Sequence, residues 1–217
     1  MNTGKAILFD LDGTLIDSEY FYYTGWSKIL DQDYGLKIDF TDWISDFAGH
    51  TLQHNVLMLQ EKYELQVDEE DMFYATRASY AKANMENIRL MPHAKEILNR
   101  AKAEDLTIGL VTSSYQTTVE AVLGKHQLLD YFSFFVTREL VEIPKPNPEP
   151  YLLAVEKLGL QKSDIVVIED TGTGCTAAKE AGLYCIAVTK QAIERSRLEH
   201  ADIILNDLAE VEKYLFN

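Results

Sequence analysis

The chain has 217 residues, of which 47% are hydrophobic and only 5 are proline; this composition excludes an intrinsically disordered protein and is sufficient for one large or two small domains. Asp and Glu outnumber Lys and Arg by 35 to 20, and the resulting net charge of −15 argues against nucleic acid or an anionic membrane surface as a partner. Any site for a phosphorylated substrate must therefore be locally positive within an acidic protein.

The sequence shows no sign of export or membrane insertion. Its first residues lack a basic segment followed by a long apolar stretch, and no apolar run approaches transmembrane length. Cys175 and Cys185 have neither the spacing of a metal site nor that of a disulfide framework. We therefore expect a cytoplasmic protein with two reduced, buried thiols.

The stretch from Ala6 to Asp12 predicts a buried strand that ends at a working surface. The apolar run Ala6–Phe9 suits a central parallel strand covered on both faces, and Asp10 and Asp12 leave on the same side if they keep the alternation of a strand. Gly13 then permits a sharp turn. Two carboxylates repel by about 4 kcal/mol at ~4 Å and an effective dielectric near 20. The pattern therefore predicts either a cation beside the pair or a proton on one of its members.

Residues 18–87 predict a helical block without a convincing buried strand. Apolar residues such as Val56, Leu59 and Tyr63 recur at helical spacing. The four helices expected here are Glu19–Leu30, Asp42–Phe47, Leu52–Tyr63 and Glu69–Met85.

From Met91 onward, helices and strands alternate regularly. This alternation predicts an α/β fold with a doubly wound parallel sheet, whose two parts, 1–16 and 88–217, form a catalytic core interrupted by a helical domain at 17–87. The strands expected after the first one are Thr107–Val111, Ser133–Thr137, Ile165–Ile168, Tyr184–Val188 and Ile203–Leu205.

Polar residues follow several of these strands. Because ligands in open α/β sheets bind outside the carboxyl ends of the strands, we expect Asp10, Thr112, Ser113, Glu169 and Asp170 to lie close together. A hydroxyl and a backbone N–H group directly after the strand Thr107–Val111 can hold phosphate oxygens. We interpret the next residue, Ser114, as a helix cap.

A loop stiffened by three prolines holds Lys145. A lysine fixed in this way can neutralise a phosphate group and a nucleophile together. Thr171, in the next loop, is a candidate hydrogen-bond partner for Lys145.

The segment Phe9–Leu15, which reads Phe-Asp-Leu-Asp-Gly-Thr-Leu, resembles the first motif of the haloacid dehalogenase superfamily, most of whose members are phosphatases. Thr112 with the Ser113 amide resembles the second motif, and Lys145-Pro-Asn-Pro resembles the third. The helical insertion after the first strand is similar to the cap of the β-phosphoglucomutase-like group. The resemblance extends over nearly the whole chain.

The residues suggest a division of roles. Asp10 is the candidate nucleophile and Asp12 the candidate general acid, so the first must be ionised and the second protonated. With Glu169 and Asp170 nearby, four carboxyls require a hard cation, for which Mg²⁺ fits best. We expect Asp10 and Asp170 to be side-chain ligands. The resemblance adds the backbone carbonyl of Asp12, and Glu169 acts either directly or through water.

We therefore predict a magnesium-dependent phosphatase, monomer or homodimer, that acts on a small phosphorylated metabolite. The alternative is a sugar-phosphate mutase. Mutases of the similar group carry a cap histidine and a cap arginine where our alignment places Tyr22 and Leu52, which favours the phosphatase. A third reading is a phospho-acceptor signalling module, although such receivers lack both the Asp-x-Asp spacing and the helical insertion.

Overall fold

The computed structural model describes residues 4–48, 52–82, 88–190 and 195–217. The chain divides into two compact units, one made of Met1–Asp17 with Arg89–Asn217 and the other of Ser18–Ile88. These boundaries lie one residue from those expected. We call the first the core unit and the second the helical unit.

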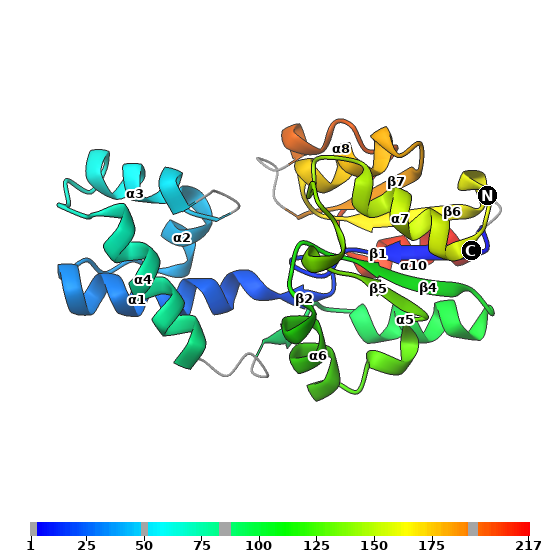
Figure 1. Ribbon diagram of the computed structural model, residues 1–217, viewed down its shortest axis with the longest axis horizontal. Coiled ribbons are helices and arrows are strands. Elements are labelled where there is room, and N and C mark those ends of the chain that lie inside the picture. The colour runs from blue at the N-terminus through cyan, green and yellow to red at the C-terminus, as the bar shows by residue number, and fades with distance from the viewer. Residues whose placement is uncertain (1–3, 49–51, 83–87, 191–194) are drawn as a thin grey trace. The chain divides into compact units, whose positions relative to one another are not determined.

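The core unit is built on a six-stranded parallel sheet in the order β5-β4-β1-β6-β7-β8 (Figure 1). The first strand of the chain lies inside the sheet and pairs with β4 on one side and β6 on the other. The predicted doubly wound α/β fold is thereby confirmed. The strands are β1 Ala6–Phe9, β4 Thr107–Val111, β5 Phe134–Val136, β6 Ile165–Glu169, β7 Tyr184–Val188 and β8 Ile203–Leu205.

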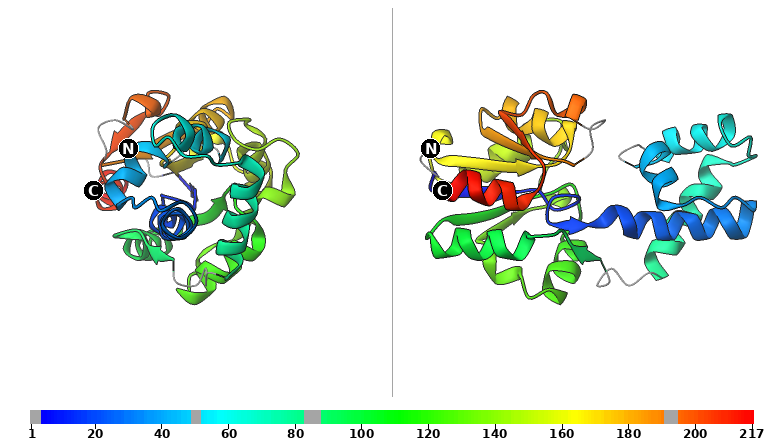
Figure 2. Two further views of the ribbon diagram at one scale, coloured as in Figure 1. Left: turned by 90° about the vertical axis from the view of Figure 1, so that its left-hand side faces the viewer. Right: turned by 180° about the vertical axis from the view of Figure 1, so that it is seen from behind.

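Helices cover both faces of this sheet (Figures 1 and 2). α5 and α10 pack together on one face, and α7 and α8 pack together on the other. These helices are α5 Ala94–Ala103, α7 Glu149–Leu158, α8 Gly172–Glu180 and α10 Leu208–Phe216; α6 is Gln116–Lys125, and short 3₁₀ turns lie at Leu129–Tyr131, Arg138–Leu140, Lys162–Asp164 and Ser196–Leu198.

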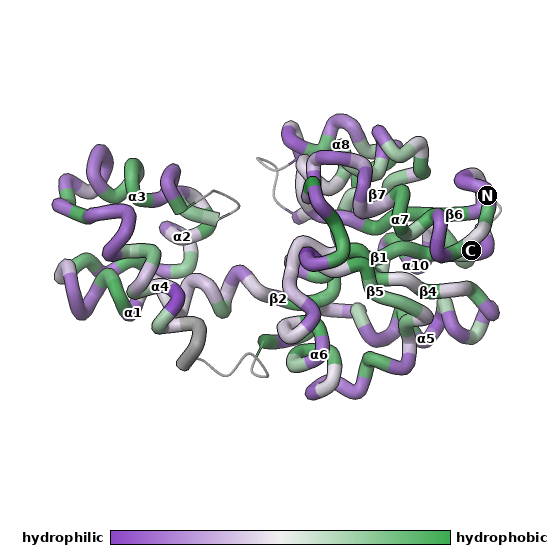
Figure 3. Tube along the Cα trace, viewed as in Figure 1, coloured by the Kyte–Doolittle hydropathy of each residue, from purple (hydrophilic) through white to green (hydrophobic). Residues whose placement is uncertain are grey.

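The strands of the sheet consist mostly of hydrophobic residues (Figure 3). All four residues of β1 are fully buried. Ala6 and Leu8 join a cluster with Ala154 of α7 and Ala178 of α8. Because side chains alternate along a strand, the remaining residues of β1 face the other helix layer. The small alanines let the helices lie close to the sheet, so the strand ends are held in a rigid frame.

A two-stranded antiparallel ribbon stands where the chain leaves and re-enters the core unit. β2 Ile16–Asp17 pairs with β3 Arg89–Leu90, and Arg89 Nη2 donates to Asp17 Oδ2 at 2.9 Å. The sequence predicts a two-stranded hinge at the join points of the insertion, 15–17 and 87–92, and the described part of the ribbon lies there. The exact strands were not predicted, because two-residue strands carry no periodic pattern. The ribbon ties together both ends of the helical insertion.

The helical unit consists of α1 Ser18–Tyr34, α2 Phe40–Asp46, α3 Leu52–Glu61 and α4 Glu69–Lys82. Its described residues include no strand, in agreement with the prediction, and the last part of the predicted helix, 83–85, lies outside the described residues. Aromatic rings fill its core: Trp43 stacks on Phe47 with ring centroids 5.7 Å apart, and Trp26 meets Trp43 edge to face. None of the described helices has the length and apolar character that crossing a bilayer requires.

A buried carboxylate, Asp46, links the end of α2 to the residues that directly follow α3. Its side chain accepts hydrogen bonds from Lys62 Nζ at 2.7 and 2.8 Å, from Tyr63 OH at 2.5 Å and from Ser45 Oγ at 3.1 Å. Burial alone raises the pKa of Asp46, but these hydrogen bonds outweigh it and lower the pKa below its ordinary value. The ionised form therefore stabilises the folded helical unit.

Replacing Asp46 by Asn tests this contribution. The pKa of Asp46 is lower in the folded chain than its value of about 3.9 in the unfolded chain. The stabilisation by the ionised carboxylate is therefore complete above about pH 3.9 and disappears as the pH falls through the folded pKa. We expect D46N to lower the free energy of unfolding by about 1–3 kcal/mol at pH 7, towards the low end because Lys62 is half exposed. The difference from the native chain should shrink below about pH 4.

Urea unfolding followed by tryptophan fluorescence measures this effect, because both tryptophans lie in the helical unit. The control is D31N, which removes the same charge from an exposed position on α1. Equal stabilities of D46N and D31N at pH 7 would contradict the prediction.

Candidate active site

The carboxyl ends of β1, β4 and β6 bring the predicted residues to one edge of the sheet. Asp10 follows β1, and its N–H donates to the carbonyl of Ile168 on β6 at 2.9 Å. Thr112 follows β4, and its N–H donates to Val136 on β5 at 2.9 Å. These bonds extend the strand ladders beyond the regular strands. The backbone at the site is thus as firmly held as the sheet itself.

The ammonium group of Lys145 is the centre of the site. It donates to Asp10 Oδ1 at 2.7 Å, to Glu169 Oε1 at 2.6 Å and to the backbone carbonyl of Val111 at 2.9 Å. Its side chain is only 5% exposed. An ammonium group has three N–H donors, so these three acceptors engage all of them. Burial lowers the pKa of Lys145, but the charges of Asp10 and Glu169 outweigh burial and raise it above its ordinary value.

The carboxylate of Glu169 is fully buried and accepts five hydrogen bonds. Oε1 accepts from Lys145 Nζ and, at 2.9 Å, from Tyr151 OH. Oε2 accepts from the N–H of Asp170 at 3.1 Å, the N–H of Thr171 at 3.3 Å and the hydroxyl of Thr171 at 3.1 Å. A carboxylate offers about four lone-pair positions, so this group is saturated with donors.

Asp10, Glu169 and Asp170 form a cluster in which one oxygen from each lies within 4.8 Å of the others. Burial is the main cause that raises the pKa of Asp10 and of Asp170 well above the ordinary range, and the neighbouring carboxylates add to it. The single ammonium of Lys145 does not balance three such groups. Buried oxygen donors with excess negative charge fit a hard divalent cation such as Mg²⁺.

The turn after β1 is shaped to admit Asp170. Gly13 has φ of +82°, and a Cβ atom at this position would lie 2.0 Å from Asp170 Oδ2. The hydroxyl of Thr14 donates to Asp170 Oδ1 at 3.2 Å. Glycine is therefore required at position 13 for two reasons, the positive φ of the backbone and the close approach of the Asp170 carboxylate.

Asp12 lies outside the acidic cluster and meets Ser114 instead. Ser114 Oγ donates to Asp12 Oδ2 at 2.7 Å, and the N–H of Ser114 donates to Thr112 Oγ1 at 2.9 Å. The prediction that Ser114 caps the next helix is wrong, because α6 begins at Gln116 and Tyr115 stands at its N-cap. Ser113 is exposed beside them. The phosphate contacts of Thr112 and Ser113, and a metal contact of the Asp12 carbonyl, stay predictions.

Three contacts of the site escaped the sequence analysis. The sequence analysis offered Lys145 as the hydrogen-bond partner of Thr171, but the Thr171 hydroxyl donates to Glu169 instead. Tyr151 reaches Glu169 from α7, and Thr14 reaches Asp170 from the turn after β1. Thr14 had a signal, since it belongs to the first motif, whereas a tyrosine within a helix reads as ordinary core.

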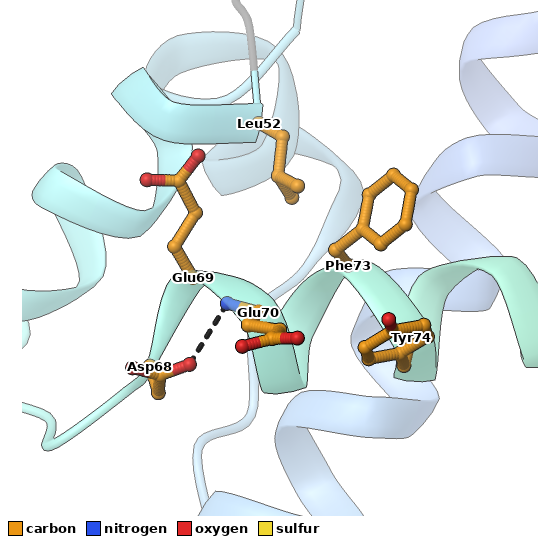
Figure 4. A pocket seen from close by; sticks show the side chains of 6 residues that line it. All are labelled: Leu52, Asp68, Glu69, Glu70, Phe73 and Tyr74. Carbon is orange, nitrogen blue, oxygen red and sulfur yellow. Dashed lines mark hydrogen bonds between the residues drawn. The ribbon is translucent and has the colours of Figure 1, made fainter.

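The helical unit contains a pocket that differs in character from the candidate active site (Figure 4). Its lining residues are Leu52, Asp68, Glu69, Glu70, Phe73 and Tyr74. Asp68 Oδ1 accepts from the N–H groups of Glu70 and Asp71 at 2.8 and 3.1 Å, so it occupies the start of α4. Three acidic side chains line this pocket and none of the predicted site residues does. Their negative charge disfavours a phosphate group.

Comparison with known proteins identifies the family. Residues 7–188 match the model of the haloacid dehalogenase-like hydrolase family, and the chain belongs to this family. This match confirms the expected superfamily. Together with relatives that are named phosphatases, it also confirms the prediction of a phosphomonoester hydrolase.

Individual relatives cover most of the chain. It is 31% identical over 226 residues to the validoxylamine A 7′-phosphate phosphatase of Streptomyces hygroscopicus subsp. limoneus, covering 95% of each protein. It is 26% identical over 192 residues to the β-phosphoglucomutase of Bacillus subtilis, covering 85% of this chain and 83% of the mutase. The crystal structure of a HAD family hydrolase from Deinococcus radiodurans R1 with bound phosphate and sodium superposes with a TM-score of 0.85 and 25% identity, over 99% of this chain and 96% of that one.

The buried position of Glu169 depends on Gly174. A Cβ atom added there would lie 1.9 Å from Glu169 Oε1, so alanine must displace the carboxylate from its donors. We expect Gly174→Ala to lower the free energy of unfolding by at least about 2 kcal/mol. Gly124→Ala is the matched control, because its added Cβ would have its nearest contact at 3.5 Å.

Chemical denaturation of both variants checks this prediction. Gly124 lies within α6, where alanine is favoured over glycine by about 0.5–1 kcal/mol, so that variant should be neutral or slightly stabilised. A Gly174→Ala protein as stable as Gly124→Ala would show that Glu169 is not held where the structure places it.

Proposed function

We propose that the protein is a magnesium-dependent phosphatase that hydrolyses a small phosphorylated metabolite through an aspartyl-phosphate on Asp10. The observation that carries this proposal is the buried Lys145 ammonium, which joins Asp10 to Glu169 with Asp170 beside them. We further propose that the protein acts in the cytoplasm as a monomer or homodimer, with neither nucleic acid nor membrane as a partner.

In the first step, a carboxylate oxygen of Asp10 attacks the phosphorus atom and the bond from phosphorus to the leaving oxygen breaks. All three protons of Lys145 are engaged before substrate binds. The bond to Asp10 is the one to be shared with a phosphate oxygen, since Glu169 and the Val111 carbonyl belong to the rigid core. Lys145 thereby neutralises the nucleophile and the transferred group together.

The metal ligands proposed here are Asp10 and Asp170, completed by the backbone carbonyl of Asp12. Bound Mg²⁺ supplies positive charge that offsets the phosphate and the carboxylates. Both side chains lie in the acidic cluster, and neither is saturated with hydrogen bonds as Glu169 is. We propose that Thr112 and the N–H of Ser113 bind the remaining phosphate oxygens, because both residues directly follow the neighbouring strand β4.

Asp12 serves as the general acid and then as the general base. It gives a proton to the leaving alkoxide and later takes one from the water that cleaves the aspartyl-phosphate. The hydroxyl of Ser114 holds Asp12 Oδ2 at 2.7 Å and so restricts the orientation of this carboxyl. Ser114 is in this sense a positioning residue for the acid.

A sugar-phosphate mutase is the second candidate, supported by the β-phosphoglucomutase of Bacillus subtilis among the relatives. A mutase returns the phosphoryl group to a sugar phosphate instead of to water. Tyr22 and Leu52 stand where our alignment places the histidine and arginine of that group, so hydrolysis is favoured. The signalling-module reading has no support from a family of hydrolases.

The first test is phosphate release from 4-nitrophenyl phosphate with and without Mg²⁺, for the native chain and for Asp10→Asn. We expect magnesium-dependent turnover that falls by at least about 10⁴-fold in the variant, because the amide cannot form the acyl phosphate. Asp130→Asn, an exposed change of the same kind in the core unit, should keep full activity. Turnover that survives Asp10→Asn would refute the mechanism.

Asp12→Asn separates the two chemical steps. 4-Nitrophenolate leaves without a proton, so the first step should proceed while hydrolysis of the aspartyl-phosphate stalls. Rapid mixing should show a burst of about one nitrophenolate per active site, followed by a steady rate lower than native by about 10²–10⁴-fold. A slow steady rate without any burst would mean that Asp12 is needed before the phosphoenzyme forms.

A further inference from the structure

Tyr151 is a fully buried residue of α7 that touches both partners of the central ion pair. Its hydroxyl donates to Glu169 Oε1 at 2.9 Å, and the Lys145 ammonium lies over its ring, 5.1 Å from the centroid. A phenylalanine would fill the same volume and offer the same ring face. What needs explanation is therefore the hydroxyl group.

The hydroxyl acts on the oxygen that holds Lys145. Glu169 Oε1 has two donors, the ammonium of Lys145 and the phenol of Tyr151, while Oε2 is fixed by Asp170 and Thr171. Removing the phenol leaves one lone pair of Oε1 buried without a partner. Lys145 is then the single donor left to Oε1, so the orientation of Oε1, and with it the aim of the Lys145 ammonium at Asp10, is less firmly held.

We propose that Tyr151 is a positioning residue that locks Glu169 as the counter-charge of Lys145 and keeps Glu169 out of the metal's ligand set. Glu169 then has no oxygen to offer, and Asp10 and Asp170 are left as the side chains that bind the cation. This inference rests on the proposed function for its kinetic consequence. Its consequence for metal binding does not depend on catalysis.

The alternation of side chains along β6 supports the same division. Ile165 and Val167 belong to the buried cluster that also contains Tyr151, so the parity of the strand directs Glu169 to this side. Asp170, the next residue, is only partly buried and is contacted by Thr14 from the turn after β1. The side chain of Glu169 is thus directed into the core, and that of Asp170 towards the site.

The test compares Tyr151→Phe with Tyr184→Phe, whose lost hydroxyl pairs with Tyr214 at 2.7 Å, at the opposite end of the sheet from the site. We expect Tyr151→Phe to lower kcat about 10- to 100-fold at a KM within about threefold of native, because Lys145 acts on the transition state. Tyr184→Phe should leave both parameters unchanged. Equal kcat values for the two variants, or a rise in KM alone, would overturn the inference.

Calorimetric titration with MgCl₂ in the absence of substrate provides the second arm. Glu169→Gln should bind Mg²⁺ within about threefold of the native chain, whereas Asp170→Asn should bind at least about tenfold more weakly. Equal weakening in both variants would place Glu169 among the ligands and overturn the inference. If the native chain hydrolyses no phosphate ester, the proposed function fails, while this titration still decides the role of Glu169.

Discussion

The buried ammonium of Lys145 is the interaction on which the rest of the site depends. It is the positive charge that joins Asp10 to Glu169, and the three groups sit in a part of the core unit that excludes most water. Burying charges is costly unless each one is paired and hydrogen-bonded. The surrounding structure meets this condition with one acceptor for every proton of Lys145 and with five donors to Glu169.

This constraint explains features that otherwise look unrelated. Gly174 lies where any side chain would collide with Glu169, and Gly13 lies where one would collide with Asp170. β1 and β6 must be neighbours, because their ends supply the two carboxylates that Lys145 bridges. A phosphate site in so acidic a protein needs local positive charge, but the charge of Lys145 is already neutralised by the carboxylates of the site. The carboxylates outnumber the ammonium group, and this excess of negative charge is what makes a divalent cation fit.

The arrangement also separates carboxylates into different chemical environments. Glu169 is saturated with donors, Asp10 shares the lysine, and Asp12 lies apart with Ser114. The nucleophile, the acid and the counter-charge proposed above are groups of one chemical type with different tasks. Their surroundings, rather than their identities, distinguish them.

The sequence by itself determined the fold class, the central strand with its two aspartates, and the strand ends at which the site would form. Buried strands have a local signature in apolar runs, and the Asp-x-Asp-Gly-Thr motif is a contiguous pattern. Only the tertiary structure decided which groups Ser114 and Tyr151 contact, and that Thr171 serves Glu169. Ser114 lies 102 residues from Asp12, so their contact depends on strand order and on side-chain rotamers, which leave no local pattern. The two-residue ribbon of β2 and β3 is likewise a product of pairing across the insertion, because strands so short acquire their conformation only from each other.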